Sequence, residues 1–211
     1  MFPRPGEISR WERAGRFGDM IELTAGQEMA LVDAAGEPYT RLRMGLGWDH
    51  APTAGAIGTG APEIDLDASA IQFGGGQAYD FAFYNNLRTR DGSVVHEGDN
   101  KSGRGQGDDE TISVDLTKVH HLIESIVFLV SSYQGHTLEW IHNAYCRLVD
   151  DRDGSDRVEL ARFTLSLGVP DTGLVMAKIL RDGDGWKLRT IGDGIKAKVP
   201  TESINALKPY M

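Results

Sequence analysis

The sequence predicts an all-β fold, namely an antiparallel β-sandwich of two sheets with one or two short helices. Three observations support this prediction. Apolar and polar residues alternate over many short stretches, turn-forming residues recur between these stretches, and segments with helical spacing are few and short. The clearest strand places Leu42, Met44, Leu46 and Trp48 on one face. The number and spacing of such stretches are typical of a sandwich.

Residues 1–20 show little periodicity and contain several Pro and Gly residues. We therefore expect an N-terminal extension with at most one short helix near residues 8–16. Strands are expected from Ile21 onward. Their ranges are 42–48, 64–68, 79–84, 93–96, 112–116, 125–131, 140–149, 158–167, 174–180 and 186–191. The run 125–131 is apolar almost throughout, which indicates a strand buried on both faces.

Turn residues separate these strands. Asp91-Gly92 and the Asp-Gly-Asp-Gly sequence at 182–185 predict hairpin turns, and residues 51–62 are expected to form a Gly-rich loop. Residues 117–124 place apolar side chains at i, i+3 and i+4, which predicts a short helix. The whole pattern amounts to roughly nine to eleven strands. Because the sequence contains no long linker, we expect one domain over residues 21–195 and a C-terminal tail over residues 196–211.

The composition is that of an ordinary globular domain, with 211 residues, of which 40% are hydrophobic and 25% are charged. A net charge of -9 argues against nucleic acid as a partner and fits the binding of cations. The sequence has neither an apolar run long enough for an integral membrane segment nor a secretory signal. Cys146 is the only cysteine, which favours a reducing, cytoplasmic location, and its apolar surroundings predict a buried thiol.

The most informative stretch is 96–110, which has an Asp-Asn pair near one end, three consecutive acids at the other and alternate glycines between them. Carboxylate, amide and carbonyl oxygens are the ligands that Ca²⁺ prefers, and glycine lets the backbone turn its carbonyls inward. An ordinary solvated acidic loop is the alternative. A P-loop is excluded by the motif, and an EF-hand by Lys101, Gly103 and Arg104 at positions that require other residues.

A second acidic pair lies in the expected strand at 64–68. The spacing of two places Asp65 and Asp67 on the same side of the strand. The two carboxylates are either a solvent-exposed face or ligands for an ion that a nearby loop completes.

Several strings occur together in an order that is typical of one family. They are Met44-Gly45-Leu46-Gly47-Trp48-Asp49, Asp65-Leu66-Asp67-Ala68-Ser69-Ala70, Phe83-Tyr84-Asn85-Asn86-Leu87, Gly98-Asp99-Asn100 and Gly105-Gln106-Gly107-Asp108-Asp109-Glu110. From about residue 21 to residue 192, the sequence strongly resembles the TerD family of tellurium-resistance and chemical-stress proteins, which also includes cyclic-AMP-binding proteins of a social amoeba.

This resemblance implies a β-sandwich that binds one or two Ca²⁺ ions. The implied ligands are Asp65, Asp67, Asp99, Asn100, Asp108, Asp109 and Glu110, with backbone carbonyls near Gly103 and Gly105. Asp49 and Asn85 are further candidates, as ligands or as partners of ligands. The sequence departs from the family pattern at Arg104 and Gln106, which stand between the loop glycines where the family loop is often richer in acids.

Two classes of function remain open at this point. The first is a non-catalytic, calcium-dependent stress-response domain that presents a surface to a protein partner or a membrane-associated complex. The alternative is a metal-dependent hydrolase or a nucleotide-binding protein that uses the same acidic cluster. No nucleophile motif accompanies the acids, which favours the first class. Zinc is disfavoured, because the spacing of His120, His121, His136 and His142 matches no structural zinc pattern.

Overall fold

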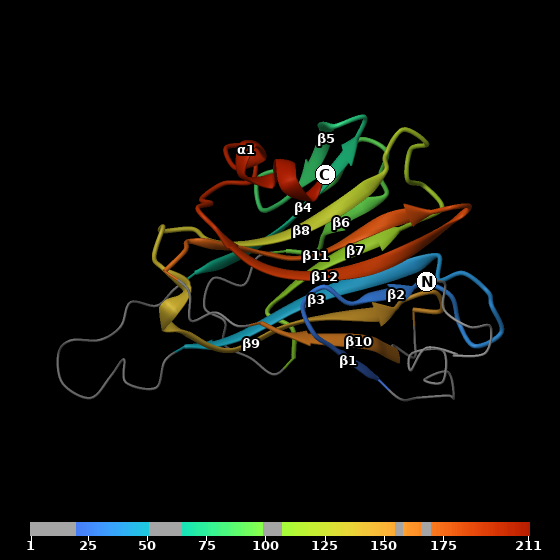
Figure 1. Ribbon diagram of the computed structural model, residues 1–211, viewed down its shortest axis with the longest axis horizontal. Coiled ribbons are helices and arrows are strands. Elements are labelled where there is room, and N and C mark those ends of the chain that lie inside the picture. Colours follow the sequence, from blue (N-terminus) through green and yellow to red (C-terminus); the bar gives the residue numbers. More distant parts are fainter. Residues whose placement is uncertain (1–19, 51–64, 99–106, 155–157, 166–169) are drawn as a thin grey trace, which may run out of the picture.

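A hydrophobic core lies between two six-stranded sheets, as Figure 1 shows. The structure is a computed structural model, and it describes residues 20–50, 65–98, 107–154, 158–165 and 170–211. The expected helix near residues 8–16 and the expected loop at 51–62 lie outside these ranges. The predicted β-sandwich is confirmed, with twelve strands in the described part of the chain.

The first sheet contains, in spatial order, β1 (Ile21–Leu23), β10 (Val158–Thr164), β9 (Ile141–Asp150), β3 (Arg41–His50), β7 (Glu110–Asp115) and β6 (Val94–His96). The second sheet contains β2 (Glu28–Ala30), β12 (Gly185–Ile195), β11 (Gly173–Asp182), β8 (Ser125–Ser132), β4 (Leu66–Gly74) and β5 (Gln77–Ala82). Neighbouring strands are antiparallel except β1 and β10, which are parallel. The helices are short: η3 (Leu138–Trp140), α1 (Ile204–Leu207) and η4 (Lys208–Tyr210).

Alternation along the strands sets which side chains enter the core. In β3, the apolar residues Met44, Leu46 and Trp48 are buried in the core between the sheets, as the period of two predicts. In β7, Ile112 and Val114 are buried, while the residues that alternate with them along the strand are half-buried. The inward face of each of these strands is therefore specified by its own sequence.

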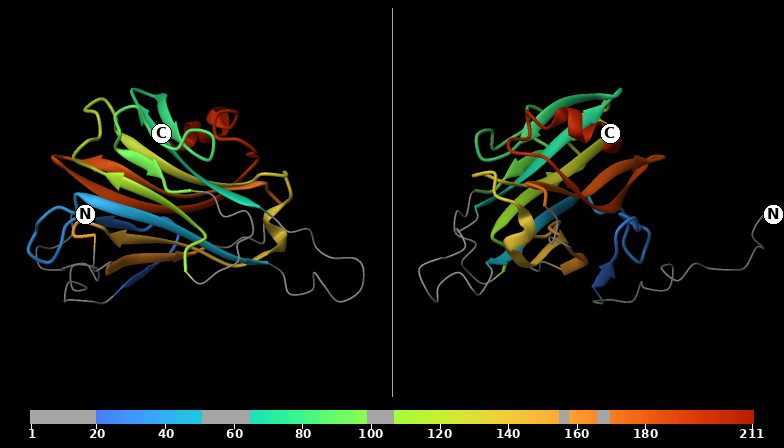
Figure 2. Two further views of the ribbon diagram at one scale, coloured as in Figure 1. Left: turned by 180° about the vertical axis from the view of Figure 1, so that it is seen from behind. Right: turned by 60° about the vertical axis from the view of Figure 1, so that its left-hand side comes forward.

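The outer face of the second sheet is buried by the C-terminal segment. Every residue of β8 is buried, which confirms the prediction from its apolar run. Leu207 of α1 packs in a second cluster with Ile71, Val127 and Leu129 from that outer face. Figure 2 shows this C-terminal turn, in red, on the side of the second sheet that faces away from the first. Residues 196–211, expected as a tail, thus form part of the packed structure.

The predicted helix at 117–124 is wrong, because this segment forms turns between β7 and β8. Its backbone groups are satisfied by side chains from elsewhere in the chain. The N–H of His120 donates to the carboxylate of Asp91, and Arg181 donates to the carbonyls of His120 and Ile123. Ile123 is buried while Leu122 is exposed. Tertiary contacts therefore outweigh the local helical spacing.

Asp91, in the predicted turn, joins the two sheets. Its Oδ1 accepts hydrogen bonds from the hydroxyls of Thr89 and Ser93, both at 2.8 Å. Its Oδ2 accepts from Nε2 of Gln72 in β4 and from the N–H of His120, both at 3.1 Å. Burial by itself would raise the pKa of Asp91, yet these hydrogen bonds lower it to about 2.

We expect this carboxylate to make folding stability depend on pH in acid. Its pKa is about 2 in the folded chain and 3.8 when unperturbed, so its contribution is complete above pH 4 to 5 and is lost as the pH falls toward 2. The loss amounts to on the order of 1–2 kcal/mol. Urea unfolding of the wild type and of Asp91→Asn at several pH values checks this. The difference between the two curves should shrink in acid, and a constant difference from pH 7 to pH 3 would contradict the assignment.

Candidate functional site

The beginnings of β4 and β7 meet at one end of the sandwich, toward the left of Figure 1. The clearest link is Glu110, whose Oε2 accepts a hydrogen bond from the backbone N–H of Ala68. Because β7 belongs to the first sheet and β4 to the second, this bond crosses between the sheets. It brings the C-terminal end of the predicted acidic stretch to the residue next to Asp67.

His96 approaches the same carboxylate oxygen. Its Nε2 lies 3.5 Å from Oε2 of Glu110, and both side chains are completely buried. Its Nδ1 accepts a hydrogen bond from the N–H of Gly98 at 3.3 Å. In a neutral ring the proton is therefore on Nε2, facing Glu110. Sequence reasoning did not assign a role to His96, although the alternation in β6 places it on the buried face with Val94.

The three consecutive acids point in different directions because β7 begins only at Glu110, so that Asp108 and Asp109 precede the regular strand. Glu110 points into the core. Asp109 lies along the end of β3, where its Oδ2 accepts from the N–H of Trp48 at 3.0 Å and its own N–H donates to the carbonyl of Leu46 at 2.8 Å. Asp108 lies on the outer face of the first sheet. The predicted ligands of one tripeptide are thus divided among three environments.

Asp108 forms a two-point ion pair with Arg147 of β9. The Nε–Oδ1 and Nη2–Oδ2 distances are 2.7 Å and 3.0 Å. Nη1 of Arg147 also donates to Glu159 at 2.9 Å, and the hydroxyl of Tyr145 donates to the carbonyl of Gly107 at 3.0 Å. The hydrogen bond to Asp108 is the main reason why the pKa of Arg147 is raised. Arg147 therefore holds Asp108 as a charged, bidentate partner.

The two glycines of β3 leave room for this cluster. A Cβ atom on Gly45 would lie 2.1 Å from Oδ2 of Asp108, and a Cβ atom on Gly47 would lie 2.5 Å from the ring of Tyr145. Both distances are far below a van der Waals contact. The Gly-x-Gly pattern before Trp48 is thus explained by close packing of side chains across the outer face of the first sheet.

Asp65 and Asp67 lie at the beginning of β4, which starts at Leu66 rather than at residue 64. The backbone of Asp65 accepts from the N–H of Tyr133 at 3.0 Å and donates to Oε1 of Gln134 at 3.2 Å. Asp67 is only 3% exposed. Its neighbours Leu66 and Ala68 face the core between the sheets, so Asp67 faces the outer side of the second sheet.

The structure therefore brings the two acidic segments to one end of the fold, with the Asp67 and Glu110 side chains on different faces of β4. Over the described part of the chain, no three His, Cys, Asp or Glu side chains lie close enough together to hold a metal ion. The remaining predicted ligands, Asp99, Asn100, Gly103 and Gly105, lie outside that part. Carboxylates are hard oxygen donors, and in this respect the chemistry of the donor set fits Ca²⁺. Asp108 fits less well, because Arg147 already occupies both of its oxygens.

The other candidates are placed as follows. Asp49 is exposed and accepts a hydrogen bond from Nδ2 of Asn143 at 2.9 Å, and Asn85 is exposed in the turn after β5. His120 and His121 stack on each other, with ring centroids 4.2 Å apart.

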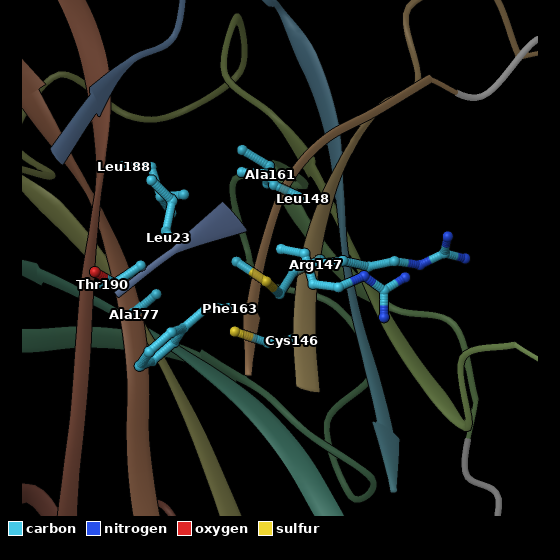
Figure 3. A pocket seen from close by; sticks show the side chains of 11 residues that line it. Leu23, Cys146, Arg147, Leu148, Ala161, Phe163, Ala177, Leu188 and Thr190 are labelled. Carbon is cyan, nitrogen blue, oxygen red and sulfur yellow. The ribbon is translucent and has the colours of Figure 1, made fainter. Parts of the chain in front are cut away.

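Cys146 lines a small cavity in the core, shown in Figure 3. The cavity holds about 10 Å³, roughly the space of one water molecule. Burial raises the pKa of Cys146 to about 12, so the thiol is un-ionised and unreactive, and the predicted buried thiol is confirmed. The guanidinium of Arg147 points away from the cavity in Figure 3. This cavity is too small for a substrate.

The fold and the acidic end define a β-sandwich protein with a candidate cation site where strands of its two sheets meet. The same fold occurs in the crystal structure of a homologue of the telluride resistance protein TerD from Streptomyces coelicolor A3(2). The TM-score is 0.63 and the identity 18%, over 78% of this chain and 95% of that one. Among the described segments, no helix is long and apolar enough to cross a membrane.

Sequence comparison identifies the family. The TerD domain model matches residues 20–201. The tellurium resistance protein TerZ of Serratia marcescens is 32% identical over 183 residues, covering 85% of this chain and 92% of that protein. The stress response protein SCP2 of Bacillus subtilis (strain 168) is 36% identical over 187 residues, covering 82% and 92%. The chain belongs to the TerD family, as its motifs predicted. The names of these two relatives state resistance and stress roles and no catalytic activity.

We expect Gly45→Ala to destabilise the protein by about 1–3 kcal/mol, because the added methyl group displaces Asp108 from Arg147. The midpoint of urea unfolding measures this. Gly185→Ala is the matched control, since its Cβ atom would be 3.7 Å from its nearest non-neighbouring heavy atom, the carbonyl oxygen of Asp182. Equal midpoints for the two variants would show that the outer face of the first sheet tolerates a side chain beside Asp108.

Proposed function

We propose that this chain is a calcium-binding, non-catalytic domain of the stress-response and tellurium-resistance type. The observation that carries the proposal is the hydrogen bond from Ala68 to Glu110, which places the C-terminal end of the acidic stretch beside the Asp-Leu-Asp strand. Membership of the TerD family and the named roles of its relatives support the biological setting.

The proposed ligands of one or two Ca²⁺ ions are oxygen atoms from both segments, and Asp67 and Glu110 contribute from different faces of β4. They are the carboxylates of Asp65, Asp67, Asp99, Asp109 and Glu110, the side chain of Asn100, and carbonyls near Gly103 and Gly105. Asp108 joins this set only by leaving Arg147, so we assign it first to the outer-face ion pair. A bound Ca²⁺ ion supplies positive charge among carboxylates that otherwise repel one another.

The residues of the chain have separate tasks in this proposal. The N–H of Ala68 holds one oxygen of Glu110 at a defined position, and the ring of His96 lies 3.5 Å from the same oxygen. The carboxylate of Asp109 is held against the backbone of Trp48. Binding therefore couples order in the acidic loop to the two strands that flank it. The ordered loop then presents a surface to a protein partner, and the single cysteine fits a cytoplasmic location.

Calcium should raise the thermal stability of the full chain. At a hundredfold excess over the Kd, binding adds about 2.7 kcal/mol, or about 5–10 °C in Tm for a domain of this size. We expect Glu110→Gln to remove most of this shift, since the amide still accepts from Ala68 but carries no charge. Melting with CaCl₂ and with a chelator, together with titration calorimetry, measures both effects.

Glu97→Gln is the matched control, because Glu97 precedes the same loop but is exposed. It should retain the calcium-dependent shift. An unchanged melting midpoint of the wild type at saturating Ca²⁺ would refute the proposal. Equal losses of the calcium-dependent shift in Glu97→Gln and Glu110→Gln would show that calcium binding depends on the overall charge of the protein and not on this site.

A further inference from the structure

Three half-buried aromatic rings in this protein carry an arginine of the same chain over one face. The pairs are Arg152 over Tyr39 at 4.5 Å, Arg162 over Tyr145 at 4.1 Å and Arg181 over Trp186 at 4.3 Å from the ring centroid. In the first two pairs, a carboxylate also binds the guanidinium, from Asp150 and Glu159 respectively. The protein thus repeatedly combines an aromatic face, an arginine and an acid.

A fourth aromatic group has a different environment. Tyr84, after β5, and Tyr133, after β8, pack edge to face, with ring centroids 5.6 Å apart and planes at 83°. Phe83 supports Tyr84 from another side, at 5.4 Å and 85°. Tyr133 is 50% exposed. Among the described residues, no arginine or lysine lies over either tyrosine ring.

Acidic residues lie near this tyrosine pair. The N–H of Tyr133 donates to the carbonyl of Asp65 at 3.0 Å, and Asp67 is the cross-strand neighbour of Ser131. Residues directly opposite each other on paired strands share a face, so Asp67 lies on the same face of the sheet as Ser131. Burial, followed by the charges of Asp67, Tyr133 and Glu202, raises the pKa of Tyr84. The C-terminal segment thus adds a further carboxylate, from Glu202.

We propose that Tyr84 and Tyr133 form a docking surface for an arginine side chain of a partner protein. The chain covers three other aromatic faces with its own arginines, and the negative charges of Asp67 and Glu202 act on Tyr84. A guanidinium suits it because it is planar, stacks on rings and is more weakly hydrated than an ammonium group. The net charge of -9 favours approach of a basic segment. Exposed tyrosine is also a frequent anchor residue in protein interfaces.

The test is fluorescence anisotropy of a labelled tetra-arginine peptide, titrated with the full chain at about 0.15 M salt to limit long-range attraction. Tyr133→Leu should weaken binding by about 3- to 10-fold, the range expected for a lost cation–π contact. Tyr133→Phe keeps the ring and should bind like the wild type. Tyr79→Leu is the matched control, because Tyr79 is also exposed, at 38%, but lies in β5.

A tetra-citrulline peptide, which has the same shape without the charge, should bind at least tenfold more weakly than tetra-arginine. The proposal is overturned when Tyr133→Leu binds tetra-arginine as tightly as Tyr79→Leu, or when citrulline replaces arginine without loss. Circular dichroism of each variant establishes that it is folded.

Asp65 and Asp67 belong both to this surface and to the proposed calcium site, so the two proposals need separate readouts. The peptide titration is therefore run in chelator as well as in CaCl₂. Peptide binding that depends on Tyr133 in chelator supports the docking surface, whatever calorimetry shows for calcium. A calcium-induced melting shift without any effect of Tyr133→Leu on peptide binding overturns the docking surface and leaves the calcium site intact.

Discussion

The buried carboxylate of Glu110 constrains the end of the sandwich at which the acidic segments meet. Taking a carboxylate out of water is unfavourable by several kcal/mol unless donors replace the lost hydration. One such donor is the N–H of Ala68 from the second sheet, and the ring of His96, from the first sheet, lies 3.5 Å from the same oxygen. The start of β7 therefore has one favourable position relative to β4.

The outer face of the first sheet depends on a different kind of constraint. Arg147 binds Asp108 with two hydrogen bonds and Glu159 with a third. These side chains can lie flat on the sheet only because Gly45 has no side chain where Asp108 sits. As a result, one of three consecutive acids serves the packing of the sheet, while its neighbours remain at the edge and in the core. The number of acidic residues in the sequence therefore overestimates the number of ligands that are available to a cation.

The C-terminal segment links the packing of the second sheet to the chemistry at its end. Leu207 covers apolar residues on the outer face of β4 and β8. The same segment carries Glu202 close enough to Tyr84 to influence its pKa. Negative charge from two parts of the chain, Asp67 in β4 and Glu202 in the C-terminal segment, thus lies close to this aromatic pair. Both proposed ligands, a divalent cation and an arginine side chain, are attracted by this one distribution of charge.

The sequence by itself determined the β-sandwich, most of the strands, the hairpin at 182–185 and the family. These properties follow from local patterns, because alternation records which face of a strand is buried and glycine records where the backbone must turn. Only the tertiary structure decided that 117–124 forms turns, that Asp108 pairs with Arg147 and that His96 faces Glu110. A carboxylate takes its role from the donors that surround it, and these donors come from strands distant in sequence. Local periodicity contains no information about which strand will lie opposite.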